Sequence, residues 1–146
     1  MSNRISITTK FTDIPCRWHA DGEIQEGRLN TQVNLEAEQT DDEGRVLGRE
    51  YLADISQHVY DIFYGKLMIS ANDPKKDSLT KDNDVVVSGV SSESLARLVL
   101  AQLDELLSND PTLQYENILG TKYPRVRCRR VELSGIENNI TAVVEG

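Results

Sequence analysis

The sequence has few residues of the kinds that mark secreted and membrane proteins. It contains only two cysteines, Cys16 and Cys128, which lie far apart along the chain. No apolar run approaches the ~20 residues that a membrane helix needs, and residues 1–10 lack the apolar stretch of a signal peptide. These absences predict a cytoplasmic protein with reduced thiols, with neither a disulfide framework nor a membrane anchor.

Positive charge is also scarce. Lys and Arg number 16 against 24 Asp and Glu, so the formal net charge is −8. Binding to nucleic acid or to an anionic membrane needs an excess of cations, so neither partner is expected. The charge is compatible with a basic protein partner, or with solubility alone. With 146 residues, 38% of them apolar, the chain has the length and composition of a single domain, residues 1–146.

Four segments alternate between apolar and polar residues, as strands with one wet face do. A phase slip at Arg129 and Arg130 in the third segment predicts a β-bulge. Residues 12–27 break the pattern and are expected to form a loop or an irregular strand edge. The four predicted strands span residues 5–11, 29–37, 126–133 and 140–144.

Two segments have helical periodicity. Apolar residues recur at helical spacing over residues 49–64, which predicts the first helix. The second helix is predicted to begin after Ser91, because a serine can cap the free amides and Glu93 suits the positive end of the helix dipole. It is predicted to end near Pro111. The polar residues 70–84 are expected to form a long loop, of the kind that is often functional.

The predicted order of elements is therefore ββααββ. It favours an α+β fold in which two helices cover one face of a four-stranded antiparallel sheet. The open edges and the second face of such a sheet need cover, and a homo-oligomer supplies it most simply.

Four short motifs follow one another along the chain. Residues 33–36 are V-N-L-E, residues 41–46 are D-D-E-G-R-V, residues 91–97 are S-S-E-S-L-A-R and residues 131–133 are V-E-L. In this order they resemble motifs of the tunnelling-fold family of 6-pyruvoyl- and 6-carboxytetrahydropterin synthases. The resemblance extends over nearly the whole chain. It implies the ββααββ scaffold, an oligomer, and a substrate base bound by Glu132.

The sequence departs from this family at the metal. The resemblance assigns zinc to three histidines, one that ends the first strand and two in an H-G-H motif that opens the second. His19 can stand for the first, but the second strand opens with Glu26-Gly27-Arg28, and an L-D-H motif after the first helix is replaced by L-M-I at residues 67–69. An open zinc site needs about three protein ligands. We therefore expect no metal, no cofactor and no zinc-dependent synthase reaction, and whether any catalysis remains stays open.

Glu132 is the main candidate for ligand binding. A carboxylate can accept hydrogen bonds from both the ring N–H and the amine of a pterin-like or guanine-like ring. Alternatively, Glu132 faces solvent and pairs with Arg129 or Arg130. These arginines belong to a basic cluster that also contains Arg125 and Arg127, which can bind an anion or pair with acids across the strands.

Cys16 and His19 are the candidate catalytic residues. Their spacing suits a thiolate–imidazole pair, and the alternative is a buried thiol beside a structural histidine. Trp18 can stack on a flat ligand or pack over the loop. Arg28 and Glu93, in the matched motifs, complete the candidates for ligand binding.

Two functions from different classes follow. The first is a diverged, non-zinc tunnelling-fold protein that binds a small heterocycle of the pterin, purine or nucleotide type at an intersubunit pocket. The alternative is a non-enzymatic, acidic interaction or inhibitor protein that docks on another macromolecule.

Overall fold

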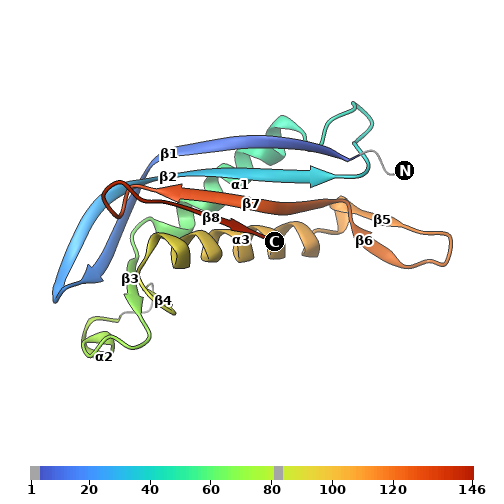
Figure 1. Cartoon of the computed structure of the whole chain (residues 1–146). Coiled ribbons are helices and arrows are strands. Elements are labelled where there is room, and N and C mark those ends of the chain that lie inside the picture. The colour runs from blue at the N-terminus through green and yellow to red at the C-terminus, as the bar shows by residue number, and fades with distance from the viewer. Residues whose placement is uncertain (1–3, 81–83) are drawn as a thin grey trace.

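A six-stranded sheet forms the centre of the computed structural model, which describes residues 4–80 and 84–146 (Figure 1). The strands lie in the order β4-β3-β1-β2-β7-β8. The prediction of four antiparallel strands is therefore wrong in number, and also in direction, because β3 pairs in parallel with both β1 and β4. The strands are β1 (Ile5–Ala20), β2 (Glu23–Ala37), β3 (Leu67–Ser70), β4 (Val85–Val87), β7 (Val126–Ser134) and β8 (Thr141–Glu145).

The first two strands form one long hairpin, although residues 12–27 were expected to form a loop or an irregular edge. A register shift between Phe11 and Ile14 changes the parity of β1, so the alternation of apolar and polar residues is interrupted there. The two strands turn at Asp21 and Gly22, which have φ of 54° and 79°. An Asp-Gly pair with two positive φ angles makes the two-residue turn that hairpins prefer.

Helices α1 (Arg49–Phe63) and α3 (Ser92–Asn109) agree closely with the two predicted helices. The Ser91 side chain accepts a hydrogen bond from the Ser94 amide at 3.1 Å, so the predicted cap is confirmed. Both helices bury their apolar stripes in one core with a single face of the sheet. That core includes Leu29, Val33, Leu35, Ile55, Val59, Leu95, Val99, Leu103, Val131 and Leu133.

The bulge predicted in the third long strand is confirmed. Asn34 pairs with Arg130 and Leu35 pairs with Cys128, so Arg129 is the extra residue on β7. Because the bulge changes the parity of the strand, Val131 and Leu133 stay in the core while Glu132 lies on the opposite face of the sheet.

The segment expected to be a long loop, residues 70–84, contains some regular structure. It begins at the end of β3 and includes the short helix α2 (Lys76–Leu79), while residues 81–83 lie outside the described part of the chain. Later in the chain, β5 (Gln114–Glu116) and β6 (Lys122–Pro124) form a separate hairpin that projects beyond the sheet (Figure 1). None of the described helices is long and apolar enough to cross a membrane.

Candidate functional site

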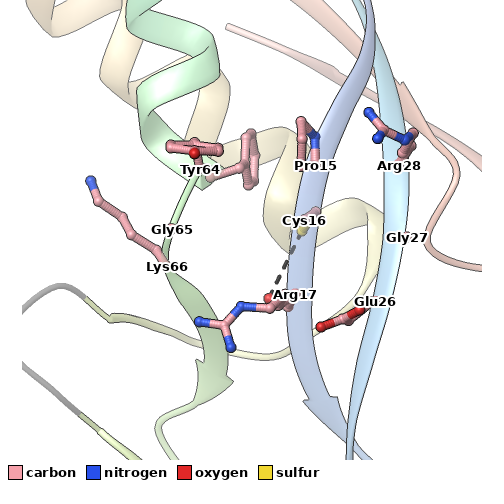
Figure 2. A pocket seen from close by; sticks show the side chains of 10 residues that line it. Pro15, Cys16, Arg17, Glu26, Gly27, Arg28, Tyr64, Gly65 and Lys66 are labelled. Atoms are coloured by element: carbon pink, nitrogen blue, oxygen red, sulfur yellow. Dashed lines mark hydrogen bonds between the residues drawn. The ribbon is translucent and has the colours of Figure 1, made fainter.

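A cavity of about 540 Å³ lies between β1 and the connection from α1 to β3 (Figure 2). We call it the β1–α1 cavity. It forms at the edge of β1 because β3 begins to pair with β1 only at Arg17. Its volume lies within the range of ~300–1,000 Å³ that is usual for small-molecule sites. The cavity is lined by Pro15, Cys16, Arg17, Glu26, Gly27, Arg28, Phe63, Tyr64, Gly65 and Lys66.

Charged groups line this cavity unevenly. Arg17 and Glu26 face each other in the register of β1 and β2. Figure 2 shows the Arg17 guanidinium group directed toward the α1–β3 connection, with the Glu26 carboxylate on the side of β1. Arg28 turns away and donates a hydrogen bond to the Asp13 carbonyl oxygen at 3.1 Å. Arg17 and Glu26 are therefore the charged pair best placed to contact a ligand.

An aromatic ring forms one wall of the β1–α1 cavity. Tyr64 lies just after α1 and is 58% exposed. Its ring stacks on that of Tyr60, with centroids 5.0 Å apart and planes 22° from parallel. The stack holds the Tyr64 ring in place before any ligand arrives, which lowers the entropic cost of stacking a flat molecule on it. The sequence did not identify Tyr64 as a residue that lines a cavity, because Tyr64 lies at the end of the apolar stripe of α1.

The Cys16 thiol lines the cavity but is buried. Burial raises its pKa to about 12, because the thiolate would lose its hydration. A thiol with such a pKa is almost entirely protonated at neutral pH and is a poor nucleophile. The geometry therefore favours the packing interpretation of Cys16, although its proposed catalytic role stays a prediction.

His19 is bonded to a residue that the sequence did not single out. Its Nδ1 lies 2.5 Å from Oδ2 of Asp73, in the segment between β3 and α2. The other carboxylate oxygen of Asp73 accepts a hydrogen bond from the Lys75 amide at 2.8 Å. His19 does not line the β1–α1 cavity. In the described residues the Cys16 thiol and the His19 ring have different hydrogen-bond partners, and the thiolate–imidazole pair stays a prediction.

Trp18 packs against the backbone of β2. A Cβ atom at Gly27 would lie 3.0 Å from Cη2 and 3.3 Å from Cζ3 of the Trp18 ring. Gly27, which has the central position of the Glu26-Gly27-Arg28 motif, therefore leaves room for this ring. Trp18 is partly buried against the core, which favours the local-packing interpretation over stacking on a ligand.

Glu132 forms an ion pair with Arg130, with Oε1 and Nη2 2.8 Å apart. This pair is the alternative that the sequence left open. Glu132 is in register with Gln32, four residues along β2 from Arg28. At ~3.3 Å per residue, about 13 Å separates Glu132 from the β1–α1 cavity. One chain therefore does not bring Glu132 together with Arg28, Cys16 or Arg17.

The remaining arginines of the basic cluster are used in structural contacts. Arg127 makes two hydrogen bonds to Asp104 on α3, at 2.8 and 2.9 Å. Nε of Arg129 lies 3.7 Å from Oε1 of Glu36 on the neighbouring strand. Arg125 donates hydrogen bonds to two backbone carbonyl oxygens. These contacts favour the pairing interpretation of the cluster over an anion site.

The exposed Glu93 occupies the first turn of α3 but does not cap it. Instead, Oε1 of Glu137 accepts from the Ser92 amide at 2.7 Å and from its hydroxyl at 2.8 Å. Glu137 thus holds the β7–β8 turn to the start of α3. Nothing in the sequence of the β7–β8 turn indicated that Glu137 would bond to the start of α3.

The donor atoms at the matched positions do not fit zinc. A guanidinium group cannot act as a metal ligand in place of histidine, and Arg28 has that position. The His19 ring is bonded to Asp73 and not to Glu26 in the described part of the chain. Within residues 4–80 and 84–146, no group of three or more His, Cys, Asp and Glu side chains is arranged to hold a metal ion.

The similarity of this chain to known proteins lies in its fold. No protein-family model matches the sequence, and no curated protein matches it. Among solved structures, an uncharacterised protein from Wolinella succinogenes has a TM-score of 0.67 and 15% identity, over 99% of both chains. The 6-pyruvoyltetrahydropterin synthase of Plasmodium vivax has a TM-score of 0.62 and 14% identity, over 99% of this chain and 98% of that one. The synthase of Plasmodium falciparum has the same score and identity, over 98% of both. The chain therefore has the α+β fold of these synthases, as the motifs predicted.

Proposed function

We propose that this chain binds a flat nitrogen heterocycle of the pterin, purine or nucleotide type in the β1–α1 cavity, without zinc. The observation that carries the proposal is the cavity itself. It combines a volume of about 540 Å³ with an exposed, pre-positioned ring at Tyr64 and with two charged side chains on the facing wall. Apolar walls with a few convergent polar groups are typical of small-molecule sites.

The position of the cavity supports the same proposal. Its β2 wall is formed by Glu26-Gly27-Arg28, the residues matched to the metal-binding motif of the synthases, and its other wall ends at Lys66, directly before the segment matched to their L-D-H motif. The cavity thus lies where the resemblance locates the metal site of these enzymes. The ligating side chains differ, so we propose binding with no zinc-dependent reaction.

A homo-oligomer is part of this proposal. Edge strands β4 and β8 each have one open side in the described chain, and the sheet face that carries Glu132 is not covered by a helix. Such edges and faces favour pairing with another copy. Glu132 lies about 13 Å from the cavity along β2, so only a second subunit can bring it to the ligand.

Calorimetric titration with pterin, guanosine and guanosine monophosphate tests the proposal. We expect at least one of them to bind, and Tyr64→Ala to weaken that binding by about tenfold or more, since stacking on an aromatic ring contributes ~1–3 kcal/mol. Tyr123→Ala is the matched control, because Tyr123 is also exposed but lies on the β5–β6 hairpin. Absence of binding by all three compounds would contradict the proposal.

A second candidate function, docking on another protein, is favoured by the tip of the β5–β6 hairpin. Ile118 and Leu119 are 101% and 84% exposed there. Adjacent exposed aliphatic side chains on a projecting hairpin are suited to a protein contact. Affinity capture from lysate at moderate salt, with wild type beside the double variant Ile118→Ser, Leu119→Ser, tests this function. Equal recovery of every protein by the two baits would count against it.

A further inference from the structure

We infer that a groove between helices α1 and α3 binds a linear organic polyamine. The groove consists of two adjoining cavities, of about 420 and 160 Å³, and we call it the α1–α3 groove. His58 on α1 and Gln102 on α3 line both cavities, so the two meet there. The inference does not depend on the proposed function, because the groove shares one lining residue, Lys66, with the β1–α1 cavity.

The larger cavity follows one face of α3. Gln102, Glu105, Leu106 and Asn109 line it, and residues three and four positions apart lie on the same face of a helix. Seven positions along α3 correspond to ~10 Å at 1.5 Å per residue. Asp110, which directly follows the helix, completes the lining at that end. A site of this shape suits an extended chain.

His58 has a buried ring nitrogen that needs a partner. Within residues 4–80 and 84–146, its Nε2 is buried and forms no hydrogen bond. An unpaired buried polar atom costs free energy, so a bonding group from outside the chain is expected at such an atom. An imidazole nitrogen without a proton accepts a hydrogen bond. Because His58 lines both cavities, a ligand with an N–H donor can supply the missing bond.

The charges at one end of the α1–α3 groove favour a cation. Glu105 and Asp110 both line the larger cavity. Hydrogen bonds from the side chain and amide of Thr112, and then from the Tyr51 hydroxyl, lower the pKa of Asp110, so this carboxylate is charged at neutral pH. The last turn of α3 lies wholly in the described part of the chain and contains no basic residue. The negative end of the helix dipole therefore adds to the attraction for a cation.

The smaller cavity contributes a mainly apolar lining. Ile62, Val85 and Leu98 line it, together with one side chain of each charge, Asp61 and Lys66. The attraction for a cation is therefore concentrated in the larger cavity. The smaller one is suited to an aliphatic segment of the same ligand.

A linear polyamine combines the groups that the groove requires. Its ammonium groups can donate charge-assisted hydrogen bonds to Glu105 and Asp110, and an amine N–H can donate to Nε2 of His58. Its methylene groups can pack on Leu106 and Leu98. A metal ion fits less well, because the described residues contain no group of three or more His, Cys, Asp and Glu side chains arranged to hold one.

Calorimetric titration of the full chain with spermidine, in about 0.15 M salt, tests the inference. At this ionic strength the Debye length is ~8 Å, so the general attraction of a chain with net charge −8 for any cation is screened. We expect saturable binding, and Glu105→Gln should weaken it about tenfold or more through the loss of a charge-assisted hydrogen bond. Glu23→Gln is the matched control, because it removes the same charge from an exposed residue beside the turn of the β1–β2 hairpin.

A second variant, His58→Leu, tests the buried nitrogen. It should weaken the binding of spermidine about fivefold, as the loss of one hydrogen bond to an uncharged acceptor predicts. Leucine is close to histidine in size, and no hydrogen bond of Nε2 within the described residues is lost. Thermal melting of all the variants without spermidine checks that they fold. Glu105 is exposed, so Glu105→Gln provides the test even where His58→Leu is destabilised.

Four outcomes would overturn the inference. Absence of spermidine binding would do so and would leave the proposed function standing, because the heterocycles are proposed to bind in another cavity. Equal weakening by Glu105→Gln and Glu23→Gln would show attraction to the overall charge alone. Mg²⁺ bound as tightly as spermidine would show that a compact cation suffices. Binding of tetralysine without binding of spermidine would assign the groove to a basic segment of a partner protein.

Discussion

Nδ1 of His19 lies 2.5 Å from Oδ2 of Asp73, although 54 positions separate the two residues in the sequence. The contact joins the end of β1 to the segment between β3 and α2. The pKa of Asp73 is lowered mainly by a hydrogen bond from the Lys75 amide, and secondly by the hydrogen bond with His19. Asp73 is therefore charged at neutral pH, and the imidazole of His19, which is 5% exposed, has an anionic partner.

We expect Asp73→Ala to lower the melting temperature at pH 7, because it leaves the buried His19 imidazole without its partner. A lowered pKa means that this stabilisation is present above the ordinary aspartate pKa of 3.8 and is lost as the pH falls through the lower, folded-state value. Differential scanning calorimetry at pH 7 and pH 3 should show the gap between wild type and variant narrowing at pH 3. Asp77→Ala, on the exposed face of α2, is the control and should melt like wild type. A gap of equal size at both pH values would contradict the assignment.

The elements whose pattern is local could be predicted from the sequence. The second strand is one example, since Leu29, Val33 and Leu35 are all buried as its alternation predicts. The bulge at Arg129 is another, because a phase slip is visible in the residues themselves. The missed part of the first hairpin had a local signal too, the Asp21-Gly22 pair, but the bulge after Phe11 obscured the strand that leads to it.

The parts that could not be predicted depend on contacts between distant segments. β3 is a run of four residues, and a short apolar run does not distinguish a buried strand from the end of a helix. The Asp73 partner of His19 and the Glu137 cap of α3 are polar residues in turns, where many such residues contact only water. For the same reason, the position of Arg17 opposite Glu26 could be known only once the register of the hairpin was known.

Gly135 should be the least replaceable glycine of the chain. It has φ of 110°, and a Cβ atom there would lie 2.3 Å from the Arg28 carbonyl oxygen and 2.9 Å from the Leu29 Cα. Both neighbours are backbone atoms of β2, which cannot move without breaking the sheet. We expect Gly135→Ala to lower the free energy of unfolding by about 3 kcal/mol or more, as backbone strain and overpacking add.

Urea unfolding of the purified variant measures this loss, and Gly48→Ala is its control. Gly48 has φ of −67° and no heavy atom within 4 Å of an added Cβ. Alanine is sterically allowed there, so the change in unfolding free energy should stay within about 1 kcal/mol, which covers the loss of a favoured cap residue. Equal stability of the two variants would contradict the close approach of Gly135 to β2.

Both thiols should be unreactive in the folded protein. Burial raises the pKa of Cys16 and of Cys128 to about 12, from an ordinary value of 9.0. At pH 8 we expect a thiol-specific disulfide reagent to label neither residue, and to label both after unfolding in urea. Rapid labelling of native Cys16 would show a reactive thiolate, and would support the catalytic role predicted for it.

The raised pKa values of Cys16 and Cys128 should also make the folded protein less stable at alkaline pH. A folded-state pKa above the unfolded one means that the stabilisation is complete below pH 9 and is lost as the pH rises toward 12. Each thiol should lower the free energy of unfolding by about 1.4 kcal/mol per pH unit in that window. Urea unfolding at pH 8, 9 and 10 measures the slope. The double variant Cys16→Ala, Cys128→Ala should have the shallower slope, and identical slopes would contradict the burial of the thiols.

The tip of the β5–β6 hairpin is held by hydrogen bonds within its own backbone segment, although its apolar side chains are exposed. Oδ1 of Asn117 accepts hydrogen bonds from the amides of Leu119 and Thr121, at 2.9 and 3.0 Å. The side chains of Ile118 and Leu119 are 101% and 84% exposed. Surface substitutions of this kind change stability by ~0.5 kcal/mol or less. We therefore expect Ile118→Ser and Leu119→Ala to unfold in urea at the same midpoint as wild type.

Leu113→Ala is the matched control for Leu119→Ala. Leu113 lies at the base of the same hairpin and is buried, so its truncation should cost about 2–5 kcal/mol through lost burial and a cavity. Sedimentation at the protein concentration of the unfolding experiment gives the oligomeric state. A large loss of stability in Leu119→Ala, together with dissociation, would contradict the exposure of the tip in solution, because that loss requires Leu119 to be buried against a second copy of the chain.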